Sequence, residues 1–276
     1  MKTTRTHQLR NATLTSLLAL AAVLPLAAQV SFTGTPYTQD FDSPALPYQS
    51  SGTPSWTFIN NDTLLGWYST ENATDAARSS SGPRSAGTLY SFGANNSSDR
   101  ALGLFAGNGY AADHTAYLGL QLINNTGAAI NSVTISFDVE QWRYHTNATT
   151  WEFSYMTTGT PGNQLSLTTG YKPDARGDAT SLHKTGDTGF ATSGGLPDGG
   201  GNGEDNKYSI SFTLTNLNWK AGDSLWLRWS SNQGNDAAGI GLDNFRLEVA
   251  QIPEPHVMAL LMGASALALL AIKRKK

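Results

Sequence analysis

The residues best suited to chemistry lie in one stretch of alternating sequence, SVTISFDVEQWRYH, which begins at Ser132. In an extended strand, successive side chains point to opposite faces. Asp138, Glu140, Trp142 and Tyr144 therefore fall on one face, opposite an apolar one. Sugars are bound by aromatic rings that stack on their C–H faces and by carboxylates that accept bonds from their hydroxyls. The four side chains are a candidate glycan-binding site, with the alternative that Trp142 is covered by a loop or by a second sheet.

The same strand offers a second chemistry, glycoside hydrolysis. Asp138 and Glu140 would lie ~7 Å apart along one strand face, which falls within the separation used by pairs of catalytic carboxylates. The other interpretation is a structural ion pair of either carboxylate with Arg143 or Arg228. Because no convincing catalytic constellation accompanies the pair, a non-enzymatic protein is preferred, and a secreted carbohydrate-active enzyme remains the alternative.

Two further stretches, YTQDFDS and GIGLDNFRLEV, open and close the central part of the chain. If these strands lie side by side, they can bring Asp40, Asp42 and Asp243 together around one Ca²⁺, a hard cation that prefers carboxylate and carbonyl oxygens. Three carboxylates at such short range repel one another without a counter-ion. The alternative is that these aspartates cap turns or stay solvated.

The elements that must position these residues are strands. The 28 glycines and a charged fraction of only 14% indicate many turns rather than long surface helices. Short stretches of period 2, separated by Gly, Asn, Asp and Pro, predict an all-β fold, an antiparallel β-sandwich most similar to a jelly roll. The expected strands are Trp56–Asn60, Thr88–Phe92, Ala101–Phe105, Ala116–Ile123, Ser132–Tyr144, Trp151–Thr157, Tyr208–Leu214, Ser224–Ser230 and Ile240–Val249.

One region interrupts this pattern. Residues 158–206 are rich in Gly, Asp and Thr and show little periodicity. A long connection without regular structure is uncommon inside a compact domain. We therefore expect a surface excursion that caps one edge of the sandwich.

Charge and cysteine content exclude several classes of function. Between residues 29 and 251 the chain has 11 Lys and Arg against 20 Asp and Glu, a balance of 11 − 20 = −9. An acidic body without a basic stripe argues against nucleic-acid binding. The chain contains no cysteine, so a disulfide framework, a thiolate metal site and a cysteine nucleophile are all ruled out.

The first residues have the pattern of a secretory signal peptide. Lys2, Arg5 and Arg10 form a positive region, and an uncharged apolar stretch follows from Leu14 to Leu26. We place the cleavage after Ala28, which makes residues 1–28 a signal helix and residues 29–251 an exported domain. The alternative is an uncleaved anchor.

The last residues form a second targeting pattern. Pro253, Glu254 and Pro255 precede an uncharged stretch, residues 257–272, which is long enough to form a single transmembrane helix across a thin bilayer. A cationic cluster at the extreme end of the chain keeps that end on the cytoplasmic side of the inner membrane. This cluster consists of Lys273, Arg274, Lys275 and Lys276.

This order of features, over residues 252–276, resembles the PEP-CTERM sorting signal of Gram-negative bacteria. The resemblance implies recognition by an exosortase, a membrane protease-transpeptidase, with processing near Pro253, Glu254 and Pro255 and delivery to the cell surface or extracellular matrix. The body is loosely similar to secreted, lectin-like bacterial jelly rolls. Together these features predict a structural or adhesive surface protein that binds an extracellular polysaccharide, and a purely structural matrix subunit is a further alternative.

Overall fold

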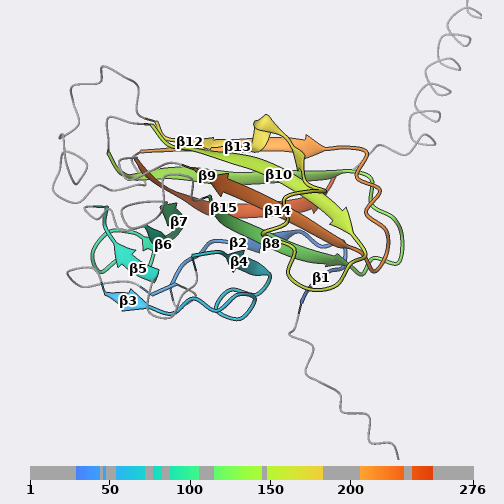
Figure 1. The fold of residues 1–276 in the computed structure, drawn as a ribbon, viewed down its shortest axis with the longest axis horizontal. Coiled ribbons are helices and arrows are strands. Elements are labelled where there is room, and N and C mark those ends of the chain that lie inside the picture. The colour runs from blue at the N-terminus through green and yellow to red at the C-terminus, as the bar shows by residue number, and fades with distance from the viewer. Residues whose placement is uncertain are drawn as a thin grey trace, which may run out of the picture.

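The computed structural model describes residues 29–43, 46–47, 54–71, 77–82, 87–105, 115–144, 148–182, 206–232 and 238–250 (Figure 1). Over these residues the chain forms an all-β sandwich. The predicted signal peptide, residues 1–28, and the sorting segment with its helix, residues 257–272, lie outside the described ranges. Among the residues that are described, no helix has the length and apolar character required to cross a membrane.

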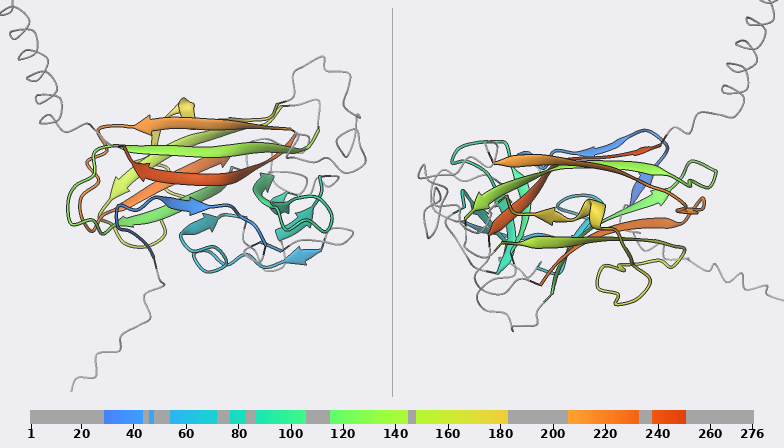
Figure 2. Two further views of the ribbon diagram at one scale, coloured as in Figure 1. Left: turned by 180° about the vertical axis from the view of Figure 1, so that it is seen from behind. Right: turned by 90° about the horizontal axis from the view of Figure 1, so that it is seen from above.

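The strands form two sheets that face each other (Figure 2). The seven-stranded sheet contains β1 (Val30–Phe32), β4 (Trp67–Ser69), β8 (Ala116–Asn124), β10 (Thr150–Thr158), β11 (Lys172–Pro173), β12 (Ala179–Thr180) and β14 (Ser224–Ser231). Its main path is β1-β8-β14-β10-β11, with β4 paired to β8 and β12 paired to β10.

The eight-stranded sheet contains β2 (Tyr37–Gln39), β3 (Ser55–Trp56), β5 (Ala77–Ser80), β6 (Thr88–Phe92), β7 (Ala101–Phe105), β9 (Val133–Arg143), β13 (Lys207–Leu214) and β15 (Gly239–Val249). Its main path is β13-β9-β15-β7-β6-β5-β3, and β2 pairs with β15. The expectation of a purely antiparallel sandwich was wrong, because β1 pairs with β8 and β5 with β6 in parallel. Both sheets are therefore mixed.

Most of the predicted strands agree with the structure to within one or two residues. The exception is the first, since the strand expected at Trp56–Asn60 ends at Trp56. The additional strands β1, β2, β4, β5, β11 and β12 are four residues long or less, too short for alternation to be recognised.

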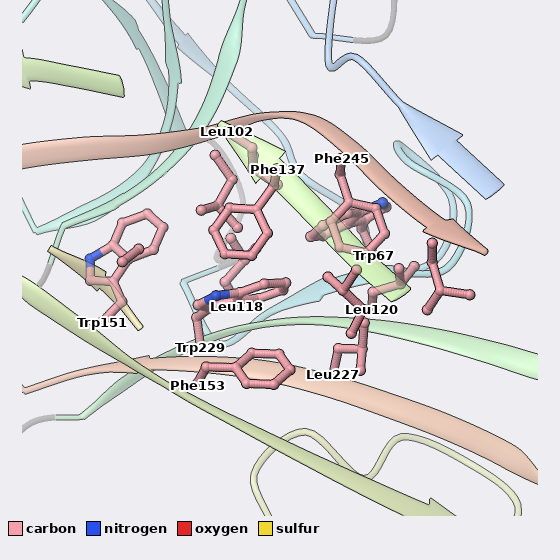
Figure 3. Packing of buried hydrophobic residues seen from close by; sticks show 14 of the residues in the cluster. Trp67, Leu102, Leu118, Leu120, Phe137, Trp151, Phe153, Leu227, Trp229 and Phe245 are labelled. Atoms are coloured by element: carbon pink, nitrogen blue, oxygen red, sulfur yellow. The ribbon is translucent and has the colours of Figure 1, made fainter. Parts of the chain in front are cut away.

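Aromatic side chains fill the space between the sheets (Figure 3). Trp229 of β14 lies at the centre, with its ring 5.4 Å from that of Phe137 and 5.2 Å from that of Phe153. It stacks on Trp67 at 6.2 Å and 13°, and Phe245 packs edge-on against both tryptophans. Fully burying a large apolar side chain stabilises the fold by about 1.5–3 kcal/mol, and aromatic pairs add about 0.5–1.5 kcal/mol. This cluster therefore fixes the two sheets against each other.

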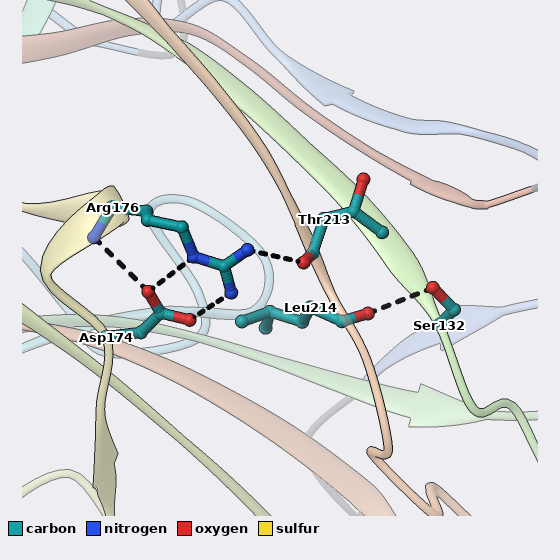
Figure 4. Close-up of polar contacts among 5 residues, drawn as sticks. All are labelled: Ser132, Asp174, Arg176, Thr213 and Leu214. Carbon is teal, nitrogen blue, oxygen red and sulfur yellow. Dashed lines mark hydrogen bonds and ion pairs between the residues drawn. The ribbon is translucent and has the colours of Figure 1, made fainter.

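Part of the predicted excursion closes the gap between the sheet edges (Figure 4). The short 3-10 helix η1 (Ala175–Gly177) follows β11, and Arg176 forms a bidentate ion pair with Asp174. Arg176 also donates to the carbonyl of Thr213 in β13, the edge strand of the other sheet. At the last residue of η1, the Gly177 carbonyl accepts a hydrogen bond from Trp229 Nε1 at 3.1 Å. A side chain at Gly177 would collide with Phe153 at 2.5 Å, so glycine permits this close approach.

Candidate functional site

The opening and closing strands of the domain lie side by side, as expected from the sequence. β2 pairs antiparallel with β15, with Gln39 opposite Phe245 and Thr38 opposite Arg246. On its other side β15 pairs with β9, which brings Asp243 opposite Asp138. Residues of the two sites predicted separately, the glycan site and the calcium site, are therefore neighbours.

Polar side chains form cross-strand rows on the outer surface of the eight-stranded sheet. One row contains Ser211, Ser136, Arg246 and Thr38, from four successive strands. A second contains Thr213, Thr134 and Glu248, and a third Ser209, Asp138 and Asp243, beside which Asn244 lies. We call the exposed and half-buried members of these rows the polar face: Thr38, Thr134, Ser136, Asp138, Ser209, Ser211, Thr213, Asn244, Arg246 and Glu248.

Asp138 is the centre of the hydrogen bonds on this face. Its Oδ1 accepts from the Ser209 hydroxyl at 2.5 Å, and its Oδ2 accepts from Asn244 Nδ2 at 3.1 Å. The same Asn244 amide donates to Asp243 Oδ2 at 3.0 Å. The three strands β13, β9 and β15 thus hold one carboxylate in a fixed orientation at the surface.

A β-bulge explains why these groups meet. The register of β15 against β9 shifts between Asp243 and Arg246, and Asn244 adopts the left-handed conformation with φ 49°. Asparagine tolerates this conformation better than other non-glycine residues, and bulges re-aim side chains. The Asn244 N–H also donates to Asp243 Oδ1 at 2.7 Å. The bulge directs the Asn244 side chain to the surface.

Asp243 differs from Asp138 in being buried, at 2% exposure. Burial away from water, and to a smaller extent the negative charge of Glu140, raise the pKa of its carboxyl to about 8, against the hydrogen bond from the Asn244 N–H. Charges at Asp99 and Asp42 add smaller increases. Asp243 is therefore largely protonated at neutral pH.

A cleft of about 320 Å³ adjoins the polar face along the β2 edge. Its walls combine hydroxyl, amide, carboxylate and guanidinium groups with the backbone of β2. The lining residues are Thr38, Gln39, Asp40, Asn244, Phe245 and Arg246. Arg246 is also held by Glu248 through a 2.6 Å ion pair at the surface. This arrangement offers many donors and acceptors to a polyhydroxylated ligand.

Three of the four predicted glycan-binding residues do not form an exposed platform. Glu140, Trp142 and Tyr144 are all buried, at 1%, 2% and 4% exposure. Trp142 Nε1 donates to Glu140 Oε2 at 2.8 Å, and the indole stacks on Phe92 at 6.3 Å and 6°. Trp142 is therefore covered, but the side chain stacked on it is Phe92 of the same sheet rather than one from a loop or a second sheet. A second aromatic cluster, Tyr90, Phe92, Ala101 and Trp142, fills this end of the outer surface.

The predicted calcium ligands are not gathered into one set. In the parts of the chain that the structure describes, no group of three or more His, Asp or Glu side chains is arranged to hold a metal ion. Instead, Asp42 Oδ1 accepts from the backbone N–H of Arg100 at 3.0 Å, and Asp40 Oδ1 accepts from the Asp42 N–H at 3.2 Å. Both carboxylates therefore bond to the backbone.

Sequence reasoning missed Arg100, a buried cation whose backbone N–H donates to Asp42. Its guanidinium is fully buried and donates from Nε to the Ser91 hydroxyl at 2.9 Å and from another nitrogen to the Ser91 carbonyl. Burial lowers its pKa to about 10, while Asp99, Asp42 and Glu140 favour the charged form. A buried guanidinium thus supplies positive charge near Asp42, one of the three predicted calcium ligands. No sequence motif marks Arg100.

The ion pair suggested for Arg228 is not formed. Arg228 lies in the other sheet, where its guanidinium stacks on Tyr171 at 3.6 Å and on Tyr117 at 4.7 Å. Since Glu140 is held by Trp142 in a buried position, the pair of Asp138 and Glu140 is not open to a substrate as a glycosidase pair would be.

No family model and no curated protein matches this chain. Solved structures with a similar arrangement include the CBM22-1 xylan-binding domain from Paenibacillus barcinonensis Xyn10C, at 11% identity over 75% of this chain and 99% of that one, with a TM-score of 0.33. Another is a non-crystalline cellulose specific carbohydrate-binding module, CBM28, at 16% identity over 73% and 96%, with a TM-score of 0.35. The K3 cleaved adhesin domain of Lys-gingipain from Porphyromonas gingivalis covers 68% and 96% at 12% identity, with a TM-score of 0.36. None of these similarities is close enough to indicate a function.

Proposed function

We propose that this chain is an exported surface or extracellular-matrix protein whose jelly-roll-like sandwich binds an extracellular polysaccharide without cleaving it. The observation that carries this proposal is the polar face, where Asp138 and Asn244 are held by cross-strand hydrogen bonds beside a cleft of about 320 Å³. Groups fixed before binding lose little conformational entropy when a ligand arrives. Hydroxyls, amides and carboxylates in rows match the repeated hydroxyls of a polysaccharide.

The test compares retention of polysaccharides by the wild-type chain and by Asp138→Ala. Loss of a hydrogen bond to a charged group costs about 1.5–3 kcal/mol, so we expect affinity to fall about 10-fold or more. Glu152→Gln is the matched control, because Glu152 is an exposed carboxylate of β10, in the other sheet. Thermal unfolding establishes that each variant is folded.

The outcomes separate the three candidate roles. Retention that depends on Asp138 without new reducing ends supports a binding protein. Release of reducing sugars that stops in Asp138→Ala supports a glycoside hydrolase instead. A folded wild-type chain that retains no polysaccharide leaves a purely structural matrix subunit, and the binding proposal is then wrong.

The sorting part of the proposal rests on the sequence alone. We propose that the C-terminal segment holds the protein in the inner membrane through residues 257–272, with Lys273 to Lys276 in the cytoplasm, until an exosortase acts near Pro253, Glu254 and Pro255. Expression with and without exosortase, followed by mass determination and membrane fractionation, tests this. A shortened C-terminus only when the enzyme is present is the expected result. An intact, membrane-held chain under both conditions would identify an ordinary anchor.

A further inference from the structure

We infer that a second saccharide-binding site, specific for neutral sugars, lies on the outer side of the seven-stranded sheet. A cleft of about 330 Å³ opens there between residues 60–68 and the turn at 161–163. We call it the amide cleft, lined by Gln29, Asn60, Asn61, Tyr68, Pro161, Gly162 and Asn163. The choice of ligand class rests on the proposed function, but the site uses none of the residues of the polar face.

The floor of the amide cleft is a rigidly held aromatic ring. Tyr68 of β4 packs on Trp226 with ring centroids 4.8 Å apart. Its hydroxyl donates to Gln121 Oε1 at 2.9 Å, and Gln121 Nε2 donates to the Ser224 hydroxyl at 2.9 Å. The ring therefore cannot turn away without breaking a chain of buried hydrogen bonds, and it is ordered before a ligand binds.

One wall consists of two asparagines fixed by backbone groups. Asn60 Oδ1 accepts from the Ser69 N–H at 2.8 Å, and its Nδ2 donates to the Ser69 carbonyl at 3.2 Å. Asn61 adopts φ 57°, and its Oδ1 accepts from the Gly66 N–H at 2.7 Å. Since the side-chain carbonyl of Asn61 already accepts a hydrogen bond from the backbone, this side chain offers a ligand the two N–H donors of its Nδ2.

The opposite wall is the turn that carries Asn163, whose Oδ1 accepts from the Leu165 N–H at 2.9 Å. Leu165 packs directly over Gly119, where an added Cβ would meet it at 2.6 Å. Arg228 fastens the segment by donating to the carbonyls of Leu165 and Leu167, at 3.1 and 2.8 Å. Both walls are thus anchored to the sheet, and the cleft is preformed.

The lining chemistry selects the ligand. Every polar side chain in the wall is an amide or a phenol, and none carries a charge. Amide donors and acceptors beside the small exposed part of Tyr68 suit the hydroxyls of a neutral sugar, while a charged saccharide would find no charged side chain among the lining residues. The volume lies at the lower end for ligand pockets, which suits a mono- or disaccharide unit of a chain.

The position of the two sites has a consequence for the proposed role. The polar face and the amide cleft belong to different sheets, so one molecule can hold two separate polysaccharide chains. Two sites on one rigid body convert weak single contacts into a cross-link between chains. The protein would then cross-link the polysaccharide chains of a matrix rather than bind them one at a time.

The test uses the full chain, purified in a detergent without a sugar headgroup, and titration with cello-, xylo- and laminari-oligosaccharides. Asn163→Asp keeps the acceptor for the Leu165 N–H but removes the two amide donors. We expect at least a 10-fold loss of affinity for the neutral oligosaccharide that binds the wild type. Asn131→Asp makes the same change at an exposed asparagine outside the cleft lining and should bind as the wild type does.

The two proposals fail in different ways. Binding that Asp138→Ala abolishes and Asn163→Asp leaves intact overturns the amide cleft and preserves the polar face. Binding lost only in Asn163→Asp preserves the amide cleft and overturns the polar face. If each variant removes part of the binding, both sites are used. The wild type should then cross-link the polymer into a turbid mixture, and neither single variant should do so. Absence of any neutral oligosaccharide binding by the folded wild type overturns the second site.

Discussion

Asp243 makes the stability of this protein depend on pH in a direction opposite to that of most carboxylates. Its pKa is about 8 in the folded state and 3.8 in an unfolded chain, with burial as the main cause. The folded state therefore binds one more proton than the unfolded state between these values. The contribution of this group to the free energy of unfolding is therefore most favourable below about pH 4, falls as pH rises toward 8, and is constant above pH 8.

The magnitude follows from the titration of one group. Each pH unit in this interval changes the free energy of unfolding by at most about 1.4 kcal/mol, so the change between pH 5 and pH 7 is at most about 3 kcal/mol. For a domain of this size each kcal/mol corresponds to about 2–4 °C in Tm. The Asp243→Asn variant has no titrating group at position 243, and its side-chain amide oxygen can still accept a hydrogen bond from Asn244. It should lose the dependence that Asp243 contributes.

Thermal unfolding at half-unit steps from pH 5 to 8 provides the measurement. The wild type should lose Tm relative to Asp243→Asn as pH rises, and the difference should level off near pH 8. Glu152→Gln removes an exposed carboxylate from β10 and should keep the wild-type slope. If Asp243→Asn and the wild type show parallel curves, the buried carboxyl is already ionised at pH 5 and the reasoning is wrong.

Two further predictions concern packing. Gly82→Ala should destabilise the fold far more than Gly127→Ala. Both glycines have positive φ, but a Cβ added at Gly82 would collide with the Trp142 carbonyl, at 1.7 Å, whereas nothing lies within 4 Å of a Cβ added at Gly127. Denaturant unfolding should give about 1–2 kcal/mol for Gly127→Ala and at least about 2 kcal/mol more for Gly82→Ala, and equal losses would contradict the clash. Arg228→Lys keeps the charge but loses the planar guanidinium between two rings, so amide hydrogen exchange over residues 164–171 should rise about 10-fold or more. Unchanged exchange would show that Arg228 does not fasten this segment.

The long strands were predictable because one buried face imposes alternation. In β9 the side chains of Val133, Ile135, Phe137 and Val139 all reach the core, as the sequence indicates. In β14 the sequence could not decide between two aromatic faces. The structure places Leu225, Leu227 and Trp229 in the core, while Trp226 is buried on the other side under Leu165 and Met156. Periodicity thus identifies two faces, but a covering segment far away in the sequence decides whether the second one is exposed.

The candidate site was predicted in part for the same reason. Asp138 and Asp243 were recognised as carboxylates on strands, and the pairing of β2 with β15 follows from their positions at the two ends of the domain. The bulge at Asn244 could not be predicted, because one extra residue in a strand leaves the composition of the strand unchanged. The amide cleft was missed since its side chains come from three separate segments.

Strand β9 shows how one sequence serves two purposes along its length. From Val133 to Asp138 buried and half-buried residues alternate, so the outer side chains reach the polar face. From Val139 to Arg143 every residue is buried, because Tyr90 and Phe92 of β6 extend the aromatic stack over Trp142 on the outer side. Asp138 and Glu140 point to the same face only 2 positions apart, yet the first lies at the surface and the second inside. The edge of the second aromatic cluster therefore marks the end of the polar face. A ligand on this face can contact β9 only as far as Asp138, together with the neighbouring strands β13, β15 and β2.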